Sequence, residues 1–287
     1  ESIIEFSGSG LEVGTTLNYS FTSDGGGTPV TGTETVTSTS ETFNNSGAGY
    51  DLSSLTDGTV TLTISLTDNA GNTGADATDT ETKDAGPPTG YTVSWDDALI
   101  NTAEVSTASF TVSNAEIGTT INNSISSSGD GNTATVSNPI TVTSTTQVVT
   151  IDVSSLDDGV LTVEVSLTDA GGNTGGTVSD NSTTLDQTAP SGYSVAIDQA
   201  DISAANQTAA SFTFAGAEVG ATYNYTLSSS AGGTDVTGSG TIATATDQIT
   251  GVDVSVLADG TITLSVTLTD PAGNEGSAAT DNVSKDA

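Results

Sequence analysis

The stretch GTVTLTISLTDNAGNTG, from Gly58 to Gly74, returns as GVLTVEVSLTDAGGNTG from Gly159 to Gly175 and as GTITLSVTLTDPAGNEG from Gly260 to Gly276. In each copy apolar residues alternate with polar ones, which is the pattern of a half-buried β-strand. The Gly and Asn residues that follow suit a tight turn. The copies are 101 residues apart, which is too long for a solenoid unit and is the usual size of one self-contained domain. The sequence therefore predicts a tandem array of β modules.

Shorter alternating segments occupy the rest of each module, and no helical apolar stripe runs for more than a turn. They contain Tyr91, Val93 and Trp95; Tyr193, Val195 and Ile197; Phe110 and Val112; Phe212 and Phe214; and Leu17, Tyr19 and Phe21. About seven short strands per 100 residues, with frequent turn signals, are typical of an immunoglobulin-type sandwich. The predicted fold class is all-β, with tandem immunoglobulin-like β-sandwich domains joined end to end by short linkers that contain proline.

The repeats place module 1 at residues 1–85, module 2 at 86–187 and module 3 at 188–287. The linkers, KDAGPPTGY and LDQTAPSGY, are expected to be extended and semi-rigid because proline fixes φ. When Phe6 is aligned with Phe110 and Phe212, nothing in module 1 matches the YTVSW and YSVAI segments. We therefore expect module 1 to lack its first strand here, and the chain to be an excerpt of a longer repetitive protein.

The composition is strongly acidic, with 36 Asp and Glu residues, two Lys residues, no Arg and a net charge of −34. Nucleic acid is not an expected partner, because phosphate binding needs basic residues, and an anionic membrane surface is disfavoured for the same reason. No apolar run is long enough to insert into a bilayer. The chain has no Cys, His or Met, which leaves carboxylates, amides, hydroxyls and carbonyls, the ligands of hard cations.

Three recurring acidic positions are expected to meet at one end of each sandwich: the linker before the first strand, the turn between the second and third strands (the B–C turn) and the turn between the last two strands (the F–G turn). The residues are Asp84, Glu116 and Asp169 for module 2 and Asp186, Glu218 and Asp270 for module 3, with Asn173 and Asn274 adding an amide oxygen; module 1 has Glu12 and Asp68, and Asp286 would serve a further module.

Converging carboxylates without a basic neighbour repel one another, and a bound cation would resolve that repulsion. Ca²⁺ accepts six to eight oxygens in loose geometry, whereas Mg²⁺ demands a tighter octahedron, so the predicted cofactor is calcium. The competing interpretation is that D-x-A-G-N is an ordinary turn in which Asp and Asn cap the backbone. For Asp57, Asp158 and Asp259, each followed directly by glycine, the plain turn is favoured.

The combined motifs resemble the bacterial immunoglobulin-like extender repeats of Bap-like and RTX-type biofilm adhesins. They are A-E-V-G or A-E-I-G, L-x-D-G before an alternating strand, L-T-D-x-A-G-N, and a D-x-T-A-P linker, and together they span nearly the whole chain. The resemblance implies an extracellular, cell-surface spacer that calcium stiffens at its junctions, in a protein for cell adhesion or biofilm formation. The two triads, Asp84, Glu116 and Asp169 and likewise Asp186, Glu218 and Asp270, match acidic positions of the family, but DAGPPTG in the first linker departs from its pattern.

Other functions stay open. An enzyme is not expected, because the carboxylates repeat in every module whereas a catalytic site is normally unique within a chain. A carbohydrate- or protein-binding module would need exposed aromatic residues, but Trp95 stands where module 3 has Ile197, which favours core packing. A self-assembling filament or surface layer is a third possibility, since a module without its first strand has an open edge. The expected partners are neighbouring modules, calcium and, for the filament, homotypic contacts.

Overall fold

The computed structural model describes residues 4–129, 133–134 and 140–287, which are almost entirely strands and turns. The chain forms two compact units: residues 1–89 with 167–176, and residues 90–166 with 177–287. Every hydrogen-bonded sheet of the described residues stays within one of the three predicted modules. The module boundaries themselves remain a prediction.

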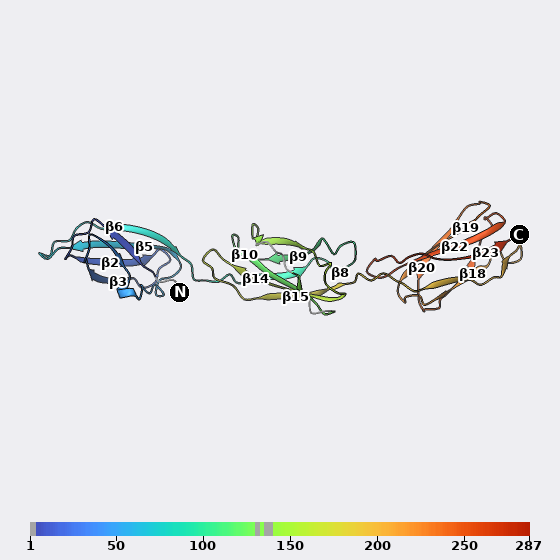
Figure 1. Ribbon diagram of the computed structural model, residues 1–287, viewed down its shortest axis with the longest axis horizontal. Helices are drawn as coiled ribbons and strands as arrows, with labels where there is room; N and C mark the ends of the chain where they lie inside the picture. The colour runs from blue at the N-terminus through green and yellow to red at the C-terminus, as the bar shows by residue number, and fades with distance from the viewer. Residues whose placement is uncertain (1–3, 130–132, 135–139) are drawn as a thin grey trace. The chain divides into compact units, whose positions relative to one another are not determined.

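Module 1 contains two antiparallel sheets, drawn in blue to cyan in Figure 1. The smaller sheet pairs β1 (Phe6–Ser9) with β4 (Ser40–Phe43). The larger sheet has the order β3 (Val30–Thr35), β2 (Thr16–Ser23), β5 (Gly58–Thr67), β6 (Ala77–Lys83). A single 3₁₀ turn, η1, spans Asn45–Gly47. The two sheets enclose a core that includes Leu17, Phe21, Phe43 and Leu55.

Module 2 has the same arrangement with additional strands. Its smaller sheet has the order β13 (Thr146–Ile151), β9 (Ala108–Ser113), β7 (Thr92–Trp95). Its larger sheet has the order β11 (Thr133–Ala134), β10 (Thr120–Ser127), β14 (Gly159–Thr168), β15 (Val178–Leu185), β8 (Leu99–Ile100), with β12 (Ile140–Thr141) also on β10. The short β8 runs parallel to β15.

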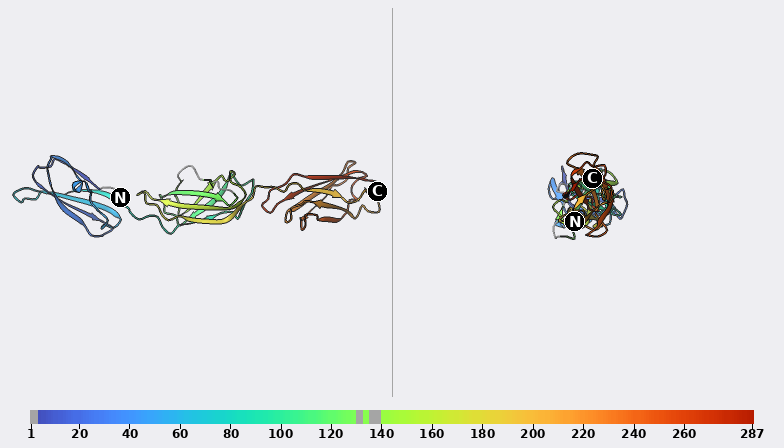
Figure 2. Two further views of the ribbon diagram at one scale, coloured as in Figure 1. Left: turned by 60° about the horizontal axis from the view of Figure 1, so that its bottom comes forward. Right: turned by 90° about the vertical axis from the view of Figure 1, so that its right-hand side faces the viewer.

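Module 3 repeats this order, and Figure 2 shows its orange and red strands as separate layers. The smaller sheet is β16 (Ser194–Ile197), β18 (Ala210–Ala215), β21 (Gln248–Val252). The larger is β17 (Asp201–Ile202), β23 (Ala279–Lys285), β22 (Gly260–Thr269), β19 (Thr222–Ser229), β20 (Val236–Thr241). The leading segment contributes β16 to one sheet and β17 to the other, as in immunoglobulin-type sandwiches. The predicted all-β sandwich fold is confirmed.

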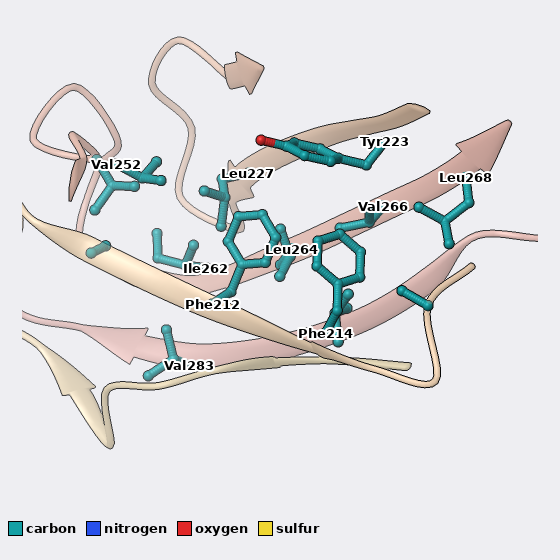
Figure 3. Close-up of a cluster of buried hydrophobic side chains, with 14 of the residues drawn as sticks. Phe212, Phe214, Tyr223, Leu227, Val252, Ile262, Leu264, Val266, Leu268 and Val283 are labelled. Carbon is teal, nitrogen blue, oxygen red and sulfur yellow. The ribbon is translucent and has the colours of Figure 1, made fainter. Parts of the chain in front are cut away.

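Alternation along β22 builds the core of module 3. Ile262, Leu264, Val266 and Leu268 are all at most 1% exposed, while the intervening Thr and Ser residues lie on the opposite face. Figure 3 shows the rings of Phe212 and Phe214 reaching from β18 towards this row. The quoted alternation therefore places one strand of the larger sheet directly over the aromatic strand of the smaller one.

The modules fill equivalent core space with different residues. Gly8 and Leu11 of module 1 occupy the positions of Phe214 and Ala217 in module 3, four residues and one residue before the glutamate of the shared Glu-Val-Gly turn. A Cβ at Gly8 would lie 3.2 Å from the Leu11 side chain, so the leucine fills the space that the missing side chain leaves. Close packing requires such an exchange of large and small residues between neighbouring positions.

Candidate functional site

The F–G turns are built around their aspartates. Asp270 is 5% exposed; its Oδ1 accepts hydrogen bonds from Gly273 N at 2.7 Å and Asn274 N at 2.9 Å, and its Oδ2 accepts one from Asn274 Nδ2 at 2.9 Å. Asp169 with Asn173, and Asp68 with Asn72, repeat this pattern. Each aspartate therefore caps the backbone of its turn, which was the alternative to metal ligation in the sequence analysis. Each also keeps lone pairs that a cation could use.

Hydrogen bonding keeps two of these carboxyl groups in their charged form. The side chain and backbone of Asn72 lower the pKa of Asp68. At Asp169 burial acts to raise the pKa, but hydrogen bonds from Asn173 and from the turn backbone outweigh it, and the net shift is downwards. Hydrogen bonds to the ionised form stabilise the carboxylate, so these two turns carry full negative charges at neutral pH.

The asparagine of each F–G turn also binds the linker that precedes its module. Asn274 Nδ2 donates to the carbonyl oxygen of Asp186 at 2.9 Å, and Asn173 Nδ2 donates to that of Asp84 at 3.0 Å. The linker aspartate is therefore connected to the turn through its backbone. The acidic linker position and the F–G turn, grouped from the sequence, are adjacent at both junctions.

A loop of module 2 completes the second junction. The Oδ1 atom of Asn274 accepts from Thr102 N at 3.0 Å and from Thr102 Oγ1 at 2.7 Å, and Asn101 Nδ2 donates to the Ala272 carbonyl at 2.8 Å. Backbone amides only donate and carbonyls only accept, so these contacts set the orientation of the Asn274 amide. The amide oxygen that the sequence assigned to calcium faces Thr102 in this arrangement.

Sequence reasoning did not find Asn101 and Thr102. They are not part of the repeat, because module 3 has Ser203 and Ala204 at the equivalent positions after β17. Asn101 and Thr102 contact residues that are 171 and 172 positions away in the sequence. No periodic signal could have identified them.

Replacing Thr102 with valine is expected to loosen this contact, because it removes the hydroxyl and keeps the shape of the side chain. The loss should be about 0.5–1.5 kcal/mol, the net contribution of one hydrogen bond. The NMR shifts of the Asn274 side-chain amide and the thermal unfolding of the chain measure it. Thr107→Val is the matched control, since the Thr107 hydroxyl donates to Glu104 O within its own loop. Unchanged Asn274 resonances in Thr102→Val would contradict the contact.

The third predicted residue, Glu218, lies near the other two acidic residues of the second junction. Burial raises its pKa, and the negative charges of Asp270 and Asp186 raise it further. Asp186, Glu218 and Asp270 therefore share one electrostatic environment. Among the residues that the structure describes, however, no cluster of three or more such side chains has the arrangement of a ready-made metal site.

The other predicted residues lie in the expected turns. The carbonyls of Glu12 and Glu116 accept from the hydroxyls of Thr15 and Thr119 in their B–C turns, and the backbone amide of Asp286 donates to Ile202 O at 2.9 Å. Asp84, Asp169 and Asn173 belong to the first compact unit, and Glu116 belongs to the second. The metal-ligand role of these residues remains a prediction.

Glu218→Gln should stabilise the cation-free chain at neutral pH. Because the pKa of Glu218 in the folded state lies above its ordinary value of 4.5, folding favours the protonated form, and this contribution is present at low pH and lost as the pH rises through the folded-state pKa. Since Glu218 is exposed and its charge is screened, the gain should be about 0.5 kcal/mol or less.

The measurement is the difference in melting temperature between Glu218→Gln and wild type, at pH 4 and at pH 7 in chelator. The difference should be larger at pH 7. Glu164→Gln on β14 makes the same change in net charge at an exposed position and serves as the control. An equal effect of both substitutions at both pH values would show that only net charge matters.

The aspartates before glycine hold the linker that leaves their own module. Asp158 Oδ1 accepts from Gln187 N at 2.7 Å, and Asp259 Oδ1 accepts from Ala287 N at 3.0 Å. Lys83 and Lys285 pair with Asp57 and Asp259 at 2.7 and 2.9 Å. The sequence favoured a plain turn at these positions, and the structure adds a role in holding the linker. The Lys-Asp pair at the end of modules 1 and 3 is the sequence feature that could have indicated this role.

The structure offers little for sugar binding. Of the described residues, the large apolar side chains that are exposed are Val13, Ile117, Val148, Val160, Val219 and Val256, and none is aromatic. Trp95 is 7% exposed and packs edge-to-face on Phe110 at 6.0 Å. Tyr193 beside the second linker donates its hydroxyl to Ser277 O at 2.6 Å. Within the described ranges there is also no helix with the length and hydrophobicity to cross a bilayer.

Comparison with known proteins gives structural neighbours. No protein-family model and no curated protein matches the chain. Similar solved structures include a tetra-tandem repeat in the extending region of a large adhesion protein, at 26% identity and TM-score 0.38, over 98% of this chain and 70% of that one. A 1.5-MDa bacterial ice-binding adhesin matches at 21% identity and TM-score 0.44, over 99% and 90%. The FN1–FN3 domains of chicken CNTN1 match at 10% identity and TM-score 0.37, over 95% and 90%. The first two are adhesins, the class that the sequence motifs resemble.

Proposed function

We propose that this chain is a spacer in the extender region of a large cell-surface adhesin, and that calcium stiffens its module junctions. Such a spacer lies outside the cell, carries a distal binding domain away from the surface and supports cell adhesion or biofilm formation. The observation that carries the proposal is the second junction. There the linker residue Asp186 is bound to Asn274, and Glu218 experiences the charges of both Asp186 and Asp270.

Both neighbouring modules hold the start of the second linker, which is what a spacer needs. Asp158 and Leu156 of module 2 bind Gln187 through its backbone and side-chain amides. Asn274 of module 3 binds the adjacent Asp186. Each contact removes backbone freedom from a linker that already contains proline. Direct hydrogen bonds therefore limit bending here before any cation binds.

Calcium would act on the carboxylates. The chain has only two lysines and no arginine, and both lysines pair with aspartates at the far end of their own modules. Nothing basic is thus available for Asp186, Glu218 and Asp270. A divalent cation would neutralise their mutual repulsion, and calcium tolerates the irregular geometry of such a set.

Forming the site would require these side chains to move. Glu218 is exposed, and the Oδ1 atom of Asp186 accepts a hydrogen bond from Thr188 N at 3.1 Å. Asp270 is already positioned by its turn. Asn274 would have to give up Thr102 to offer its oxygen, so we assign the cation to the three carboxylates. In the sequence repeat, the equivalent residues are Asp84, Glu116 and Asp169.

Calorimetry and small-angle X-ray scattering test the proposal, with the chain in calcium, in magnesium and in chelator at constant ionic strength. Extracellular calcium sites have Kd values on the order of 10⁻⁴ to 10⁻³ M. Calcium at about 100 times Kd should raise the free energy of unfolding by about 2.7 kcal/mol. Chelation should shorten the maximum dimension of the chain.

Asp186→Asn combined with Glu218→Gln should abolish the calcium response and leave the fold intact. The matched control is Asp235→Asn with Glu164→Gln, which removes the same charge from exposed positions. If wild type responds equally to calcium and magnesium, or not at all, the junction site is wrong. If the control responds as weakly as the test variant, calcium acts on net charge alone.

A further inference from the structure

The strand that ends the smaller sheet is an edge strand in every module: β4 in module 1, β13 in module 2 and β21 in module 3. Each pairs on one side with its neighbour, and within the described ranges no strand pairs with its other side. Such an edge presents backbone groups that can pair with another chain, and proteins usually protect it with charges, bulges or short strands. Modules 1 and 3 show these protections, and module 2 does not.

The three edge strands differ in length and regularity. β13 pairs with β9 over six consecutive residues, from Thr146 to Ile151, without a register shift. β4 has only four residues. β21 is interrupted, because its pairing with β18 shifts register and Gly251 has a φ of 74°, which favours glycine. The longest regular edge of the three therefore belongs to module 2.

A carboxylate that modules 1 and 3 have at this edge is replaced by an amide in module 2. The Glu41 carboxylate accepts from the backbone amide and the hydroxyl of Thr37, at 2.8 and 2.7 Å, and Asp247 beside β21 caps the same loop of module 3. In module 2 the side-chain oxygen of Gln147 accepts from the same two groups of Thr143, at 3.2 and 3.1 Å. Module 2 thus keeps the loop contact and loses the negative charge.

The next residue of β13 presents an apolar side chain to solvent. Val148 is 55% exposed, and Thr146 and Thr150 are exposed on the same face of the strand. The residues equivalent to Val148 are Thr42 and Gln248, which are polar and bond to side chains of their own modules. A six-residue segment rich in β-branched residues, without charge, proline or glycine, is typical of strands that pair between chains.

We propose that β13 is a docking edge for a second copy of this chain, which pairs its own β13 antiparallel to the first. The exposed face of β13 has the order Thr146, Val148, Thr150, which is the same type of residue from either end. Pairing about a two-fold axis would therefore place Val148 opposite Val148 of the second copy and Thr146 opposite Thr150. Directly opposed threonines are favourable pairs in antiparallel strands.

The charge of the chain favours this occupant. With a net charge of −34, two copies repel each other over most of their surface, and the uncharged β13 is a place where they can approach. A basic partner would find no carboxylate in β13 to pair with. Gln147 Nε2 donates to the Val148 carbonyl at 3.1 Å, and strand pairing would replace this side-chain bond with a main-chain one. The proposal depends neither on calcium nor on the spacer function.

Sedimentation velocity and NMR of the full 287-residue chain in chelator test the proposal. A single strand pair is a small interface of the weak, transient class, so the concentrations should run from about 10 μM to about 1 mM. Over this range the chain should pass from monomer to dimer, and the backbone amides of residues 146–151 should shift most. Added salt should strengthen dimerisation, because it screens the repulsion between acidic copies.

Two substitutions separate strand pairing from net charge. Val148→Lys makes the chain less acidic and would place like charges opposite each other in the dimer, which is destabilising. Gln147→Glu makes the chain more acidic and restores the carboxylate that Glu41 uses for the loop contact of module 1. Both variants should keep the fold and weaken dimerisation at least 10-fold, because a charge on an edge strand opposes pairing with another chain.

Val160→Lys is the matched control, since it makes the same substitution at an exposed valine of β14, in the larger sheet of the same module. It should dimerise at least as well as wild type. A chain that stays monomeric to about 1 mM, unchanged dimerisation of Val148→Lys, or an equal loss in Val160→Lys would overturn the proposal. Stronger dimerisation of Val148→Lys with weaker dimerisation of Gln147→Glu would also overturn it, because net charge alone would then govern association.

Discussion

Phe212→Ala is expected to lower the free energy of unfolding of module 3 by about 3–5 kcal/mol, the usual loss for a buried phenylalanine. Phe212 is 1% exposed and contacts the rings of Phe214 at 5.7 Å and Tyr225 at 5.2 Å. It lies between β18 and the apolar row of β22 (Figure 3). The substitution removes a ring from the contact between the two sheets and leaves a cavity that the strands cannot close.

Chemical denaturation followed by NMR hydrogen exchange measures this loss for module 3 separately from the other modules. Val219→Ala, at an exposed position of the same module, should change stability by about 0.5 kcal/mol or less. Phe6→Ala should cost less than Phe212→Ala, because Phe6 is only partly buried. Equal losses at Phe6 and Phe212 would contradict this difference in burial.

Asp270→Ala is the second large effect, at about 2–4 kcal/mol. The substitution leaves the backbone amides of Gly273 and Asn274 and the side-chain amide of Asn274 without their acceptor. Each buried donor without a partner costs about 1–3 kcal/mol, although water can recover part of this at a turn. Asn274 would then lose its orientation, and the contact with Asp186 should weaken as well.

Thermal unfolding and the exchange rate of the Asn274 amides measure this effect. Asp253→Ala is the matched control, because Asp253 also accepts a turn amide, from Ser255 at 2.9 Å, but at an exposed position. The control should lose less stability and leave the junction resonances in place. If the two substitutions prove equivalent, Asp270 is an ordinary turn residue without a part in the junction.

The fold was predictable because its signals are local and occur three times. The alternation from Val60 to Leu66 returns from Leu161 to Leu167 and from Ile262 to Leu268, and each copy is the central part of a strand in the larger sheet. Turn residues and alternating strands depend on neighbours within a few positions. The structure confirmed this sandwich, including the first strands at Thr92–Trp95 and Ser194–Ile197.

The junction was only partly predictable. Topology alone brings the linker, the B–C turn and the F–G turn to one end, so the sequence could group Asp186, Glu218 and Asp270. It could not determine which side-chain atoms face one another. Asn274 connects to Asp186 by its amide nitrogen and to Thr102 by its amide oxygen, and this depends on how the loop of module 2 meets the turn of module 3.

The sequence by itself determined the modular all-β architecture, the acidic charge and the restriction to oxygen chemistry, because composition and periodicity are properties of the chain. Only the tertiary structure decided that Asp158 holds its own outgoing linker and that Thr102 bonds to Asn274. These contacts join residues that are 29 and 172 positions apart. Such relations arise when packed elements meet in space, and no local pattern records them.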